Sequence, residues 1–247
     1  MKISIITSTY NSKEALPSAL ESIKKQDYDD IEHIIIDGAS TDGTIELIKE
    51  YVNSNANAQY ISESDKGIYD ALNKGIEKAT GDYIGILHSD DLLASNTIIS
   101  TIVNKLKAEK TDCIYGDLKY VAKDDIDKVI RNWVSGEFTK KKLHRGWMPP
   151  HPTLFVKKEL FEKYGTYDLQ FRIAADYDFM TRILSNGVSI SYLPEVVTLM
   201  RVGGESNKSI KNIWKKSMED LKVMRRNNIG GLRCLFMKNF SKIGQFF

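Results

Sequence analysis

Two adjacent aspartates, Asp90 and Asp91, follow an apolar run over residues 83–87. Such a run predicts a buried strand, and carboxylates at its end are either solvated turn residues or side chains placed to hold a charged group. Carboxylate oxygens suit Mg²⁺ or Mn²⁺, which typically take one or two protein carboxylates beside water and phosphate oxygens. We therefore expect Asp91, on an exposed loop, to hold a divalent cation, and Asp90 to orient sugar or ribose hydroxyls.

Polar side chains also stand where three other expected strands end. They are Thr9, Tyr10 and Asn11 after residues 3–7, Asp37 within residues 33–38, and Glu63 and Asp65 after residues 59–62. Each of them alone is an ordinary loop or helix-cap residue, and Asp42 is assigned mainly to that class. In a mostly parallel open sheet, however, ligands bind beyond the carboxyl ends of the strands. Four polar clusters at one sheet edge therefore favour a binding site.

The elements that must position these residues alternate along the chain. Strands are expected over residues 3–7, 33–38, 59–62 and 83–88, and helices over residues 15–23, 45–52 and 68–79. This alternation predicts right-handed crossovers and a mostly parallel α/β sheet that helices cover on both faces. Residues 1–106 are therefore interpreted as a nucleotide-binding half.

The pattern changes after Leu106. Residues 112–121 and 127–134 predict antiparallel strands joined by a turn. Beyond them we expect a strand over residues 151–156, helices over 157–165 and 176–184, and a strand pair over 190–202 that Pro194 breaks. No Gly/Ser linker separates the halves. We therefore expect one domain over residues 1–208, with an acceptor half at 107–208, followed by a helical tail at 209–247.

Composition narrows the class of protein. The 247 residues are 42% hydrophobic, which is enough for an ordinary core, and the formal net charge of +2 argues against a general nucleic-acid binder. Cys113 and Cys234 lie far apart and follow no metal-ligand spacing, which favours a reducing compartment. No stretch has the roughly 20 apolar residues that span a bilayer, and the first residues do not resemble a signal peptide. We expect a cytoplasmic protein.

Five motifs in order resemble glycosyltransferase family 2. They are STYN at 8–11, DGASTDGT at 37–44, SDKGIYDALNKGI at 64–76, GDYIGILHSDD at 81–91 and AADYDFMTR at 174–182. The resemblance covers roughly residues 1–205 and implies the GT-A fold and an inverting enzyme that uses nucleotide-activated sugars. It also implies that Ser89-Asp90-Asp91 is the metal element, that Asp37 lies at the nucleobase edge, and that Asp176 is the catalytic base.

Three positions depart from the family pattern. Asp37-Gly38 stands where many members have two aspartates, His88 replaces the usual asparagine, and Ala175 replaces a glutamate before Asp176. The missing second aspartate at Gly38 most affects the expected recognition of the nucleobase through Asp37. None of the three removes the metal carboxylate or the base carboxylate.

Sugar transfer defines the roles that these residues would take. A bound cation stabilises the charge on the leaving diphosphate, and a carboxylate accepts the proton of the acceptor hydroxyl. We expect Asp176 to be that base because the family motif aligns there, while spacing alone leaves Asp178 open, and either aspartate can be a plain helix N-terminal residue. Thr9, Tyr10, Asn11, Asp37, Asp65, Lys66 and Asp90 are expected to bind the nucleotide sugar, with a uridine diphosphate donor the commoner case.

Several residues have both a functional and a structural interpretation. Lys66 or Lys74 can meet phosphate or line a solvated face. Trp147 can stack on a sugar ring or belong to the core. His151 lies on an expected acceptor-side loop, where a histidine is more often exposed. Residues 201–209 fit a mobile lid or a plain turn.

Other function classes fit less well. A nucleotidyltransferase requires a glycine-rich basic signature after the first strand, and residues 7–15 contain no glycine. A dinucleotide-binding dehydrogenase requires G-x-G-x-x-G at that place. A non-catalytic nucleotide-sugar-binding protein is expected to have lost Asp91 or Asp176, and both are present.

The tail carries most of the excess positive charge. Its cations are Lys211, Lys215, Lys216, Lys222, Arg225, Arg226, Arg233, Lys238 and Lys242, against Glu219 and Asp220. Leu232, Leu235, Phe236, Phe240, Ile243, Phe246 and Phe247 form one apolar stripe if the segment is helical. A basic amphipathic helix is typical of a segment that lies on an anionic membrane surface, where a lipid-linked saccharide acceptor would be found. The alternative is a helix packed on the domain or on a dimer partner.

Overall fold

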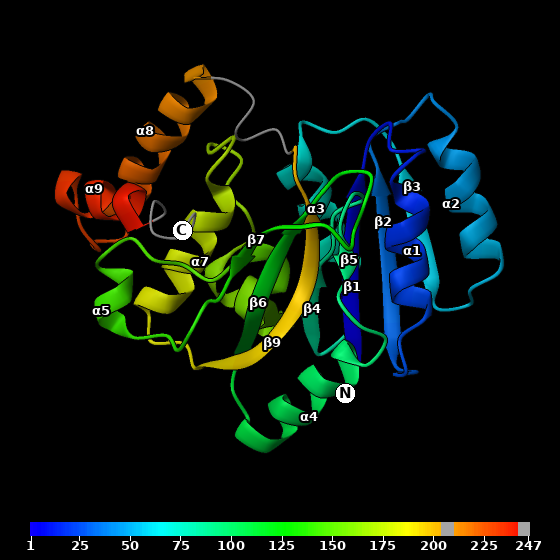
Figure 1. The fold of residues 1–247 in the computed structure, drawn as a ribbon, viewed down its shortest axis with the longest axis horizontal. Helices are drawn as coiled ribbons and strands as arrows, with labels where there is room; N and C mark the ends of the chain where they lie inside the picture. The colour runs from blue at the N-terminus through cyan, green and yellow to red at the C-terminus, as the bar shows by residue number, and fades with distance from the viewer. Residues whose placement is uncertain (204–209, 242–247) are drawn as a thin grey trace.

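A sheet runs through the middle of the molecule (Figure 1), and the computed structural model describes residues 1–203 and 210–241. Its first part is parallel: β1 (Ile3–Thr9) lies between β2 (Ile31–Asp37) and β4 (Tyr83–Ile86), and β3 (Ala58–Ser62) extends it beyond β2. The connecting helices are α1 (Leu16–Lys24), α2 (Thr44–Asn53) and α3 (Ile68–Lys78). These elements confirm the strand–helix alternation expected for the first half.

The second part of the sheet is mixed. Strand β8 (Phe155–Lys157) pairs antiparallel with β4 and with β6 (Cys113–Val121), and β9 (Ile190–Arg201) pairs parallel with β6. The short β5 (Leu92–Leu93) pairs with β9, and β7 (Val129–Trp133) forms the expected antiparallel hairpin with β6. The helices here are α4 (Ile98–Glu109), α5 (Lys140–Leu143), α6 (Lys158–Tyr164) and α7 (Ala175–Ser185).

Two local predictions were wrong. Residues 190–201 form one continuous strand rather than a pair broken at Pro194, because register shifts opposite Tyr115 and Asp117 create an irregularity around the proline. A proline lacks the N–H of a regular ladder and is tolerated at such a bulge. The second concerns residues 151–156, where His151–Thr153 form a 3₁₀ turn and β8 starts only at Phe155.

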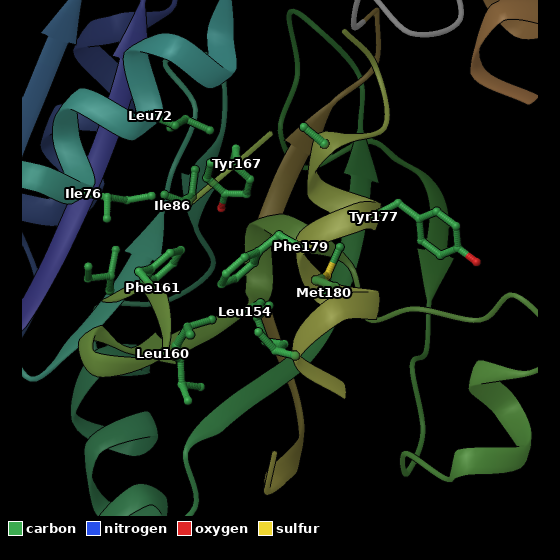
Figure 2. Packing of buried hydrophobic residues seen from close by; sticks show 14 of the residues in the cluster. Leu72, Ile76, Ile86, Leu154, Leu160, Phe161, Tyr167, Tyr177, Phe179 and Met180 are labelled. Atoms are coloured by element: carbon green, nitrogen blue, oxygen red, sulfur yellow. The ribbon is translucent and has the colours of Figure 1, made fainter. Parts of the chain in front are cut away.

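The core lies on both faces of the sheet, as the alternation of side chains along β1 requires. Ile6 belongs to the cluster under α3, α6 and α7, whereas Ile3 and Ile5 belong to the cluster under α1 and α4. Figure 2 shows the first cluster, in which Phe161 stacks on Phe179 with ring centroids 4.5 Å apart. Because α7 carries Asp176, this packing fixes the helix on which the expected base stands.

The tail helices α8 (Ile210–Arg226) and α9 (Leu232–Ser241) pack beside α7 at the end of the molecule opposite α2 (Figure 1). Tyr177 and Phe179 leave α7 in different directions (Figure 2), and the ring of Tyr177 lies 3.1 Å from Lys238 Nζ of α9. Lys238 also forms a buried ion pair with Asp220 of α8, with 2.8 Å between Nζ and Oδ1. Among the described residues, no helix has the length and apolarity needed to cross a membrane. The part of the expected apolar stripe beyond residue 241 lies outside the described residues.

Candidate active site

The ends of three parallel strands bring the first polar residues together. Thr9, Asp37 and Ser62 are register neighbours on β1, β2 and β3. The Asp37 carboxylate is fully buried and accepts hydrogen bonds from Ser40 N at 3.0 Å and from Ser62 Oγ at 2.6 Å. Asp37 therefore braces the loop after β2, and a nucleobase would have to share it with these donors.

The loop after β1 is tied to the loop after β2 through Asn11. This residue has a positive φ of 47°, its Oδ1 accepts a hydrogen bond from Thr41 N at 3.0 Å, and its own N–H donates to Ser40 Oγ at 2.8 Å. The exposed ring of Tyr10 is next to it. These contacts hold Tyr10 at the mouth of the site without burying it.

Gly38 has a spatial reason for lacking a side chain. A Cβ atom added there would lie 2.8 Å from Asp65 Oδ2 and 3.3 Å from Tyr10 Cδ2. Asp65 is itself held by Gly67 N, which donates to Oδ1 at 2.8 Å. Tyr10 and Asp65 thus close around the position where the family pattern implies a second aspartate, and together they offer an aromatic face beside a carboxylate.

The two lysines next to α3 differ in their surroundings. Lys74 Nζ lies 2.7 Å from Glu63 and 3.8 Å from Asp70, and these acidic neighbours raise the pKa of its ammonium group. The side chain of Lys66 is exposed, and its backbone N–H donates to Asp70. The surroundings therefore favour Lys66 over Lys74 as the cation that meets a phosphate.

Asp91 is buried, which corrects the expectation of an exposed loop carboxylate. Its Oδ1 accepts a hydrogen bond from Arg201 N at 3.2 Å, whereas its Oδ2 has no hydrogen-bond partner. Burial, and after it the neighbouring charge of Asp90, raises the pKa of Asp91 well above its usual range. A buried carboxylate oxygen without a donor fits a divalent cation, which would supply the missing positive charge.

The backbone around this pair is fixed from β9. Arg201 Nη1 donates to the carbonyl of Asp90 at 2.7 Å, and Ser89 Oγ lies 3.0 Å from Ser12 Oγ. In residues 1–203 and 210–241, no three His, Cys, Asp or Glu side chains converge as a metal cage. The contacts of Arg201 and Ser89 fix the backbone directly before Asp91.

Asp176 stands at the start of α7 and is partly exposed. Its Oδ1 accepts hydrogen bonds from Tyr177 N at 2.8 Å and from Tyr69 Oη at 3.1 Å. Burial, and after it the charge of Asp176, raises the pKa of Tyr69 well above its ordinary value, so the phenol keeps its proton and donates it. Asp176 is thus an oriented carboxylate at the surface of the site.

Two histidines, the half-buried His88 and the buried His151, lie close to each other near the start of the Ser89-Asp90-Asp91 segment. The rings of His88 and His151 are 6.1 Å apart, and His151 Nε2 lies 2.7 Å from Tyr167 Oη. Burial lowers the pKa of His151 to about 4 and also lowers that of His88, while the charges of Asp90 and Asp176 oppose the shift at His88. His151 is therefore not an exposed loop residue. From the sequence, His88 was expected only to differ from the family pattern. Its position directly before Ser89 was the signal that it belongs to the site.

Trp147 and residues 201–209 are the remaining candidates from the sequence. Trp147 packs against Tyr115 and Phe138, with ring centroids 5.7 and 5.8 Å away, which is the structural alternative. Arg201 braces the loop of Asp90, whereas residues 204–209 of the expected lid lie outside the described residues.

Comparison with known proteins identifies the family of the chain. The sequence profile described as Glycosyl transferase family 2 matches residues 4–165. A relative named PGL/p-HBAD biosynthesis glycosyltransferase, from Mycobacterium bovis (strain BCG / Pasteur 1173P2), is 30% identical over 223 residues, which cover 87% of this chain and 83% of the relative. The chondroitin synthase of Pasteurella multocida (strain Pm70) is 26% identical over 85% of this chain, but only 22% of the synthase is covered.

Solved structures share the fold. TarS of S. aureus in complex with UDP-GlcNAc matches with a TM-score of 0.73 and 20% identity, over 92% of this chain and 65% of that one. The mannosyltransferase PcManGT from Pyrobaculum calidifontis, in complex with GDP-Man and Mn²⁺, gives 0.68 and 19% over 97% and 69%. This chain spans just under two thirds of that TarS chain. The profile match and the 30% identical relative confirm the resemblance carried by the motifs: the chain belongs to glycosyltransferase family 2.

Proposed function

We propose that the protein transfers a sugar from a nucleoside diphosphate sugar to an acceptor hydroxyl with inversion at the anomeric carbon, in cell-surface polysaccharide or glycolipid synthesis. The observation that carries the proposal is the buried carboxylate of Asp91, whose Oδ2 has no hydrogen-bond partner in the loop after strand β4. The charges of its neighbour Asp90 and of Asp176 at the start of α7 both oppose the lowering of the pKa of His88 by burial, and this supports a cation position and a base position in one site.

The donor side of the proposal uses the loops after the parallel strands. Tyr10 and Asp65 would bind the base with Asp37 behind them, and Thr9 and Asn11 would hold the ribose side. Asp90 would orient ribose or sugar hydroxyls, and Lys66 would meet the diphosphate. Asp91 would hold Mn²⁺ or Mg²⁺, which supplies the positive charge that stabilises the leaving diphosphate.

The acceptor side depends on Asp176. Its carboxylate would accept the proton of the attacking hydroxyl, and the bonds from Tyr69 and Tyr177 N hold it in one orientation. Asp178 is a poorer candidate because its fully buried carboxylate is engaged by Arg182 and Asn227. His151 and Tyr167 form a buried hydrogen-bonded pair. Burial lowers the pKa of His151 and raises that of Tyr167, and the charge of Asp176 raises the pKa of each.

The donor is proposed to be a hexose or N-acetylhexosamine on uridine diphosphate, with guanosine diphosphate as the alternative. Two proteins of the same fold support this choice: TarS was solved with UDP-GlcNAc, and PcManGT with GDP-Man and Mn²⁺. The exposed side of Tyr10 offers stacking to either base. A donor panel therefore has to contain both nucleotides.

We also propose that the protein works at the cytoplasmic face of an anionic membrane on a lipid-linked saccharide. The described part of the tail exposes large apolar side chains beside cations. They are Trp214, Met218, Leu232 and Phe236, with exposed cations at Lys215, Lys222, Arg225 and Arg233. Apolar side chains within a basic surface are the composition of an interfacial membrane contact.

The direct test incubates purified protein with a panel of uridine and guanosine diphosphate sugars and measures the nucleoside diphosphate released with Mn²⁺ and with EDTA. Release that requires the cation and is lost in Asp91→Asn supports the proposal. Tight binding of a nucleotide sugar without release under any acceptor condition would favour a non-catalytic binding protein. Pyrophosphate release from a nucleoside triphosphate and a sugar phosphate would instead identify a nucleotidyltransferase.

A further inference from the structure

The N-cap residue of helix α7 supplies no side-chain cap. That residue is Ala174, and its side chain accepts no hydrogen bond from the first turn. The N–H groups at a helix start need acceptors, and a negative charge near them is favourable because of the helix dipole. The segment that leads into Asp176 therefore depends on an acceptor from elsewhere.

Glu219 of α8 is that acceptor. Its Oε2 accepts hydrogen bonds from Ile173 N at 2.8 Å and from Ala174 N at 3.0 Å, and its Oε1 accepts one from Arg172 N at 3.2 Å. Three N–H donors on one carboxylate make a charge-assisted set, which is stronger than the same bonds to a neutral acceptor. A residue of the tail thus fixes the backbone immediately before the expected base.

The peptide unit between Ile173 and Ala174 links Glu219 to Asp176. Its N–H points to Glu219, and its carbonyl, on Ile173, accepts a hydrogen bond from Tyr69 Oη at 2.9 Å. The same hydroxyl lies 3.1 Å from Asp176 Oδ1. One phenolic proton is thus shared between the Ile173 carbonyl and the Asp176 carboxylate. The orientation of this peptide plane determines how strongly the Tyr69 hydroxyl donates to each of the two acceptors.

We propose that Glu219 is a positioning residue for Asp176 and that α8 is part of the catalytic unit. The inference rests on the proposed role of Asp176 as the base. Without the Glu219 carboxylate, the peptide plane loses the acceptor that holds its N–H. Tyr69 then follows the displaced carbonyl, and Asp176 loses one of the two bonds that orient it toward the acceptor hydroxyl.

The kinetic test compares Glu219→Ala and Glu219→Gln with Arg226→Ala as the matched control. Arg226 also anchors α8 to the domain, through Asp168, the Asp178 carboxylate and the ring of Phe171, but makes no hydrogen bond to residues 172–174. We expect Glu219→Ala to lower kcat about tenfold while the donor KM stays within about twofold. Glu219→Gln, which keeps an acceptor oxygen, recovers part of that loss, and Arg226→Ala keeps the wild-type kcat. Equal kcat values in Glu219→Ala and Arg226→Ala, in folded proteins, overturn the inference.

A second measurement does not depend on activity. Hydrogen–deuterium exchange of the amides of residues 172–174 should be faster in Glu219→Ala than in wild type and unchanged in Arg226→Ala. If wild-type protein releases nucleoside diphosphate from no donor, the proposed function fails, yet this exchange still decides whether Glu219 fixes the segment. Unchanged exchange in Glu219→Ala overturns the inference whether or not the protein is active.

Discussion

Asp178 and Arg182 form an ion pair one helical turn apart on α7, with 3.0 Å between Asp178 Oδ2 and Arg182 Nη2. Asp178 is fully buried there and also receives a hydrogen bond from Asn227 of the tail. The two aspartates in the first turn of α7 therefore have different surroundings. Asp176 is partly exposed at the site, and Asp178 ties α7 to neighbouring segments.

This difference predicts opposite results for two matched variants. Asp176→Asn should lower kcat by roughly a hundredfold or more with little effect on donor binding. Asp178→Asn should mainly lower the free energy of unfolding, by ~1–3 kcal/mol, because Arg182 keeps its bonds to the carbonyls of Tyr164 and Thr166. Steady-state kinetics and urea unfolding on both variants check this. An inactive but stable Asp178→Asn beside an active Asp176→Asn would assign the base to Asp178.

Asp91→Asn should separate cation binding from folding. The neutral amide removes a buried charge beside Asp90, so the metal-free variant should be at least as stable as wild type. Mn²⁺ should raise the melting temperature of wild type and leave that of the variant unchanged, because a ligand stabilises only the state that binds it. Thermal unfolding with and without Mn²⁺ measures this. Full activity of wild type in EDTA would contradict the assignment.

The sequence predicted those parts of the site that depend on local pattern. Strand ends placed Thr9 and Asp37 side by side because parallel strands in register end at one edge. The burial of Asp91 could not be predicted, since it depends on Arg201, 110 residues further along the chain. The bond between Tyr69 and Asp176 likewise joins segments 107 residues apart. Such contacts follow from how β9 and α7 pack against the first half of the chain, and no local sequence pattern predicts them.

Buried neutral histidines should make the protein sensitive to acid. Burial lowers the pKa of His33 to about 3 and that of His151 to about 4, both below the ordinary value of 6.5. Each therefore contributes full stability above pH 6.5 and loses it as the pH falls toward the folded-state pKa. The unfolded chain takes up the proton first. The limiting loss is ~1.4 kcal/mol per pH unit for each histidine.

The check uses His33→Gln, because His33 lies between Thr7 and Tyr51 and away from the proposed catalytic residues. Urea unfolding of wild type and variant between pH 7 and pH 5 should give a shallower pH dependence for the variant. The variant can be less stable at every pH without affecting the comparison of slopes. Identical slopes would show that His33 does not contribute to the acid sensitivity.

The buried pair of Lys238 and Asp220 should hold the tail in place. Lys238→Met leaves the Asp220 carboxylate buried beside an apolar side chain and should cost ~3–5 kcal/mol of unfolding free energy. The double variant Lys238→Met with Asp220→Leu should recover much of that loss, because no unpaired charge remains. Equilibrium unfolding of the single and double variants measures the coupling. Losses that simply add would contradict it.

Membrane binding by the tail is better tested with point variants than by deleting α9. Truncation after Asn228 removes Lys238, so it would leave Asp220 buried without its partner and destabilise the protein. Trp214→Glu and Leu232→Glu change exposed side chains of α8 and α9, and Val134→Glu is a control of similar exposure outside the tail. We expect wild type and the control to co-sediment with anionic vesicles at low salt and the two tail variants to lose most of that binding. Failure of wild type to bind would leave the tail as a packing element.

The contact of Glu219 with the start of α7 also bears on when the enzyme becomes active during its synthesis. The ribosome releases the sheet, and with it Asp91 and Asp176, before α8 and α9 emerge. A nascent chain at that stage holds the carboxylates but lacks the acceptor that orders residues 172–174. If Glu219 positions Asp176 as proposed, competence for sugar transfer would follow folding of the sheet by the time needed to translate and dock the tail. Incomplete chains would then bind donor before they can turn it over.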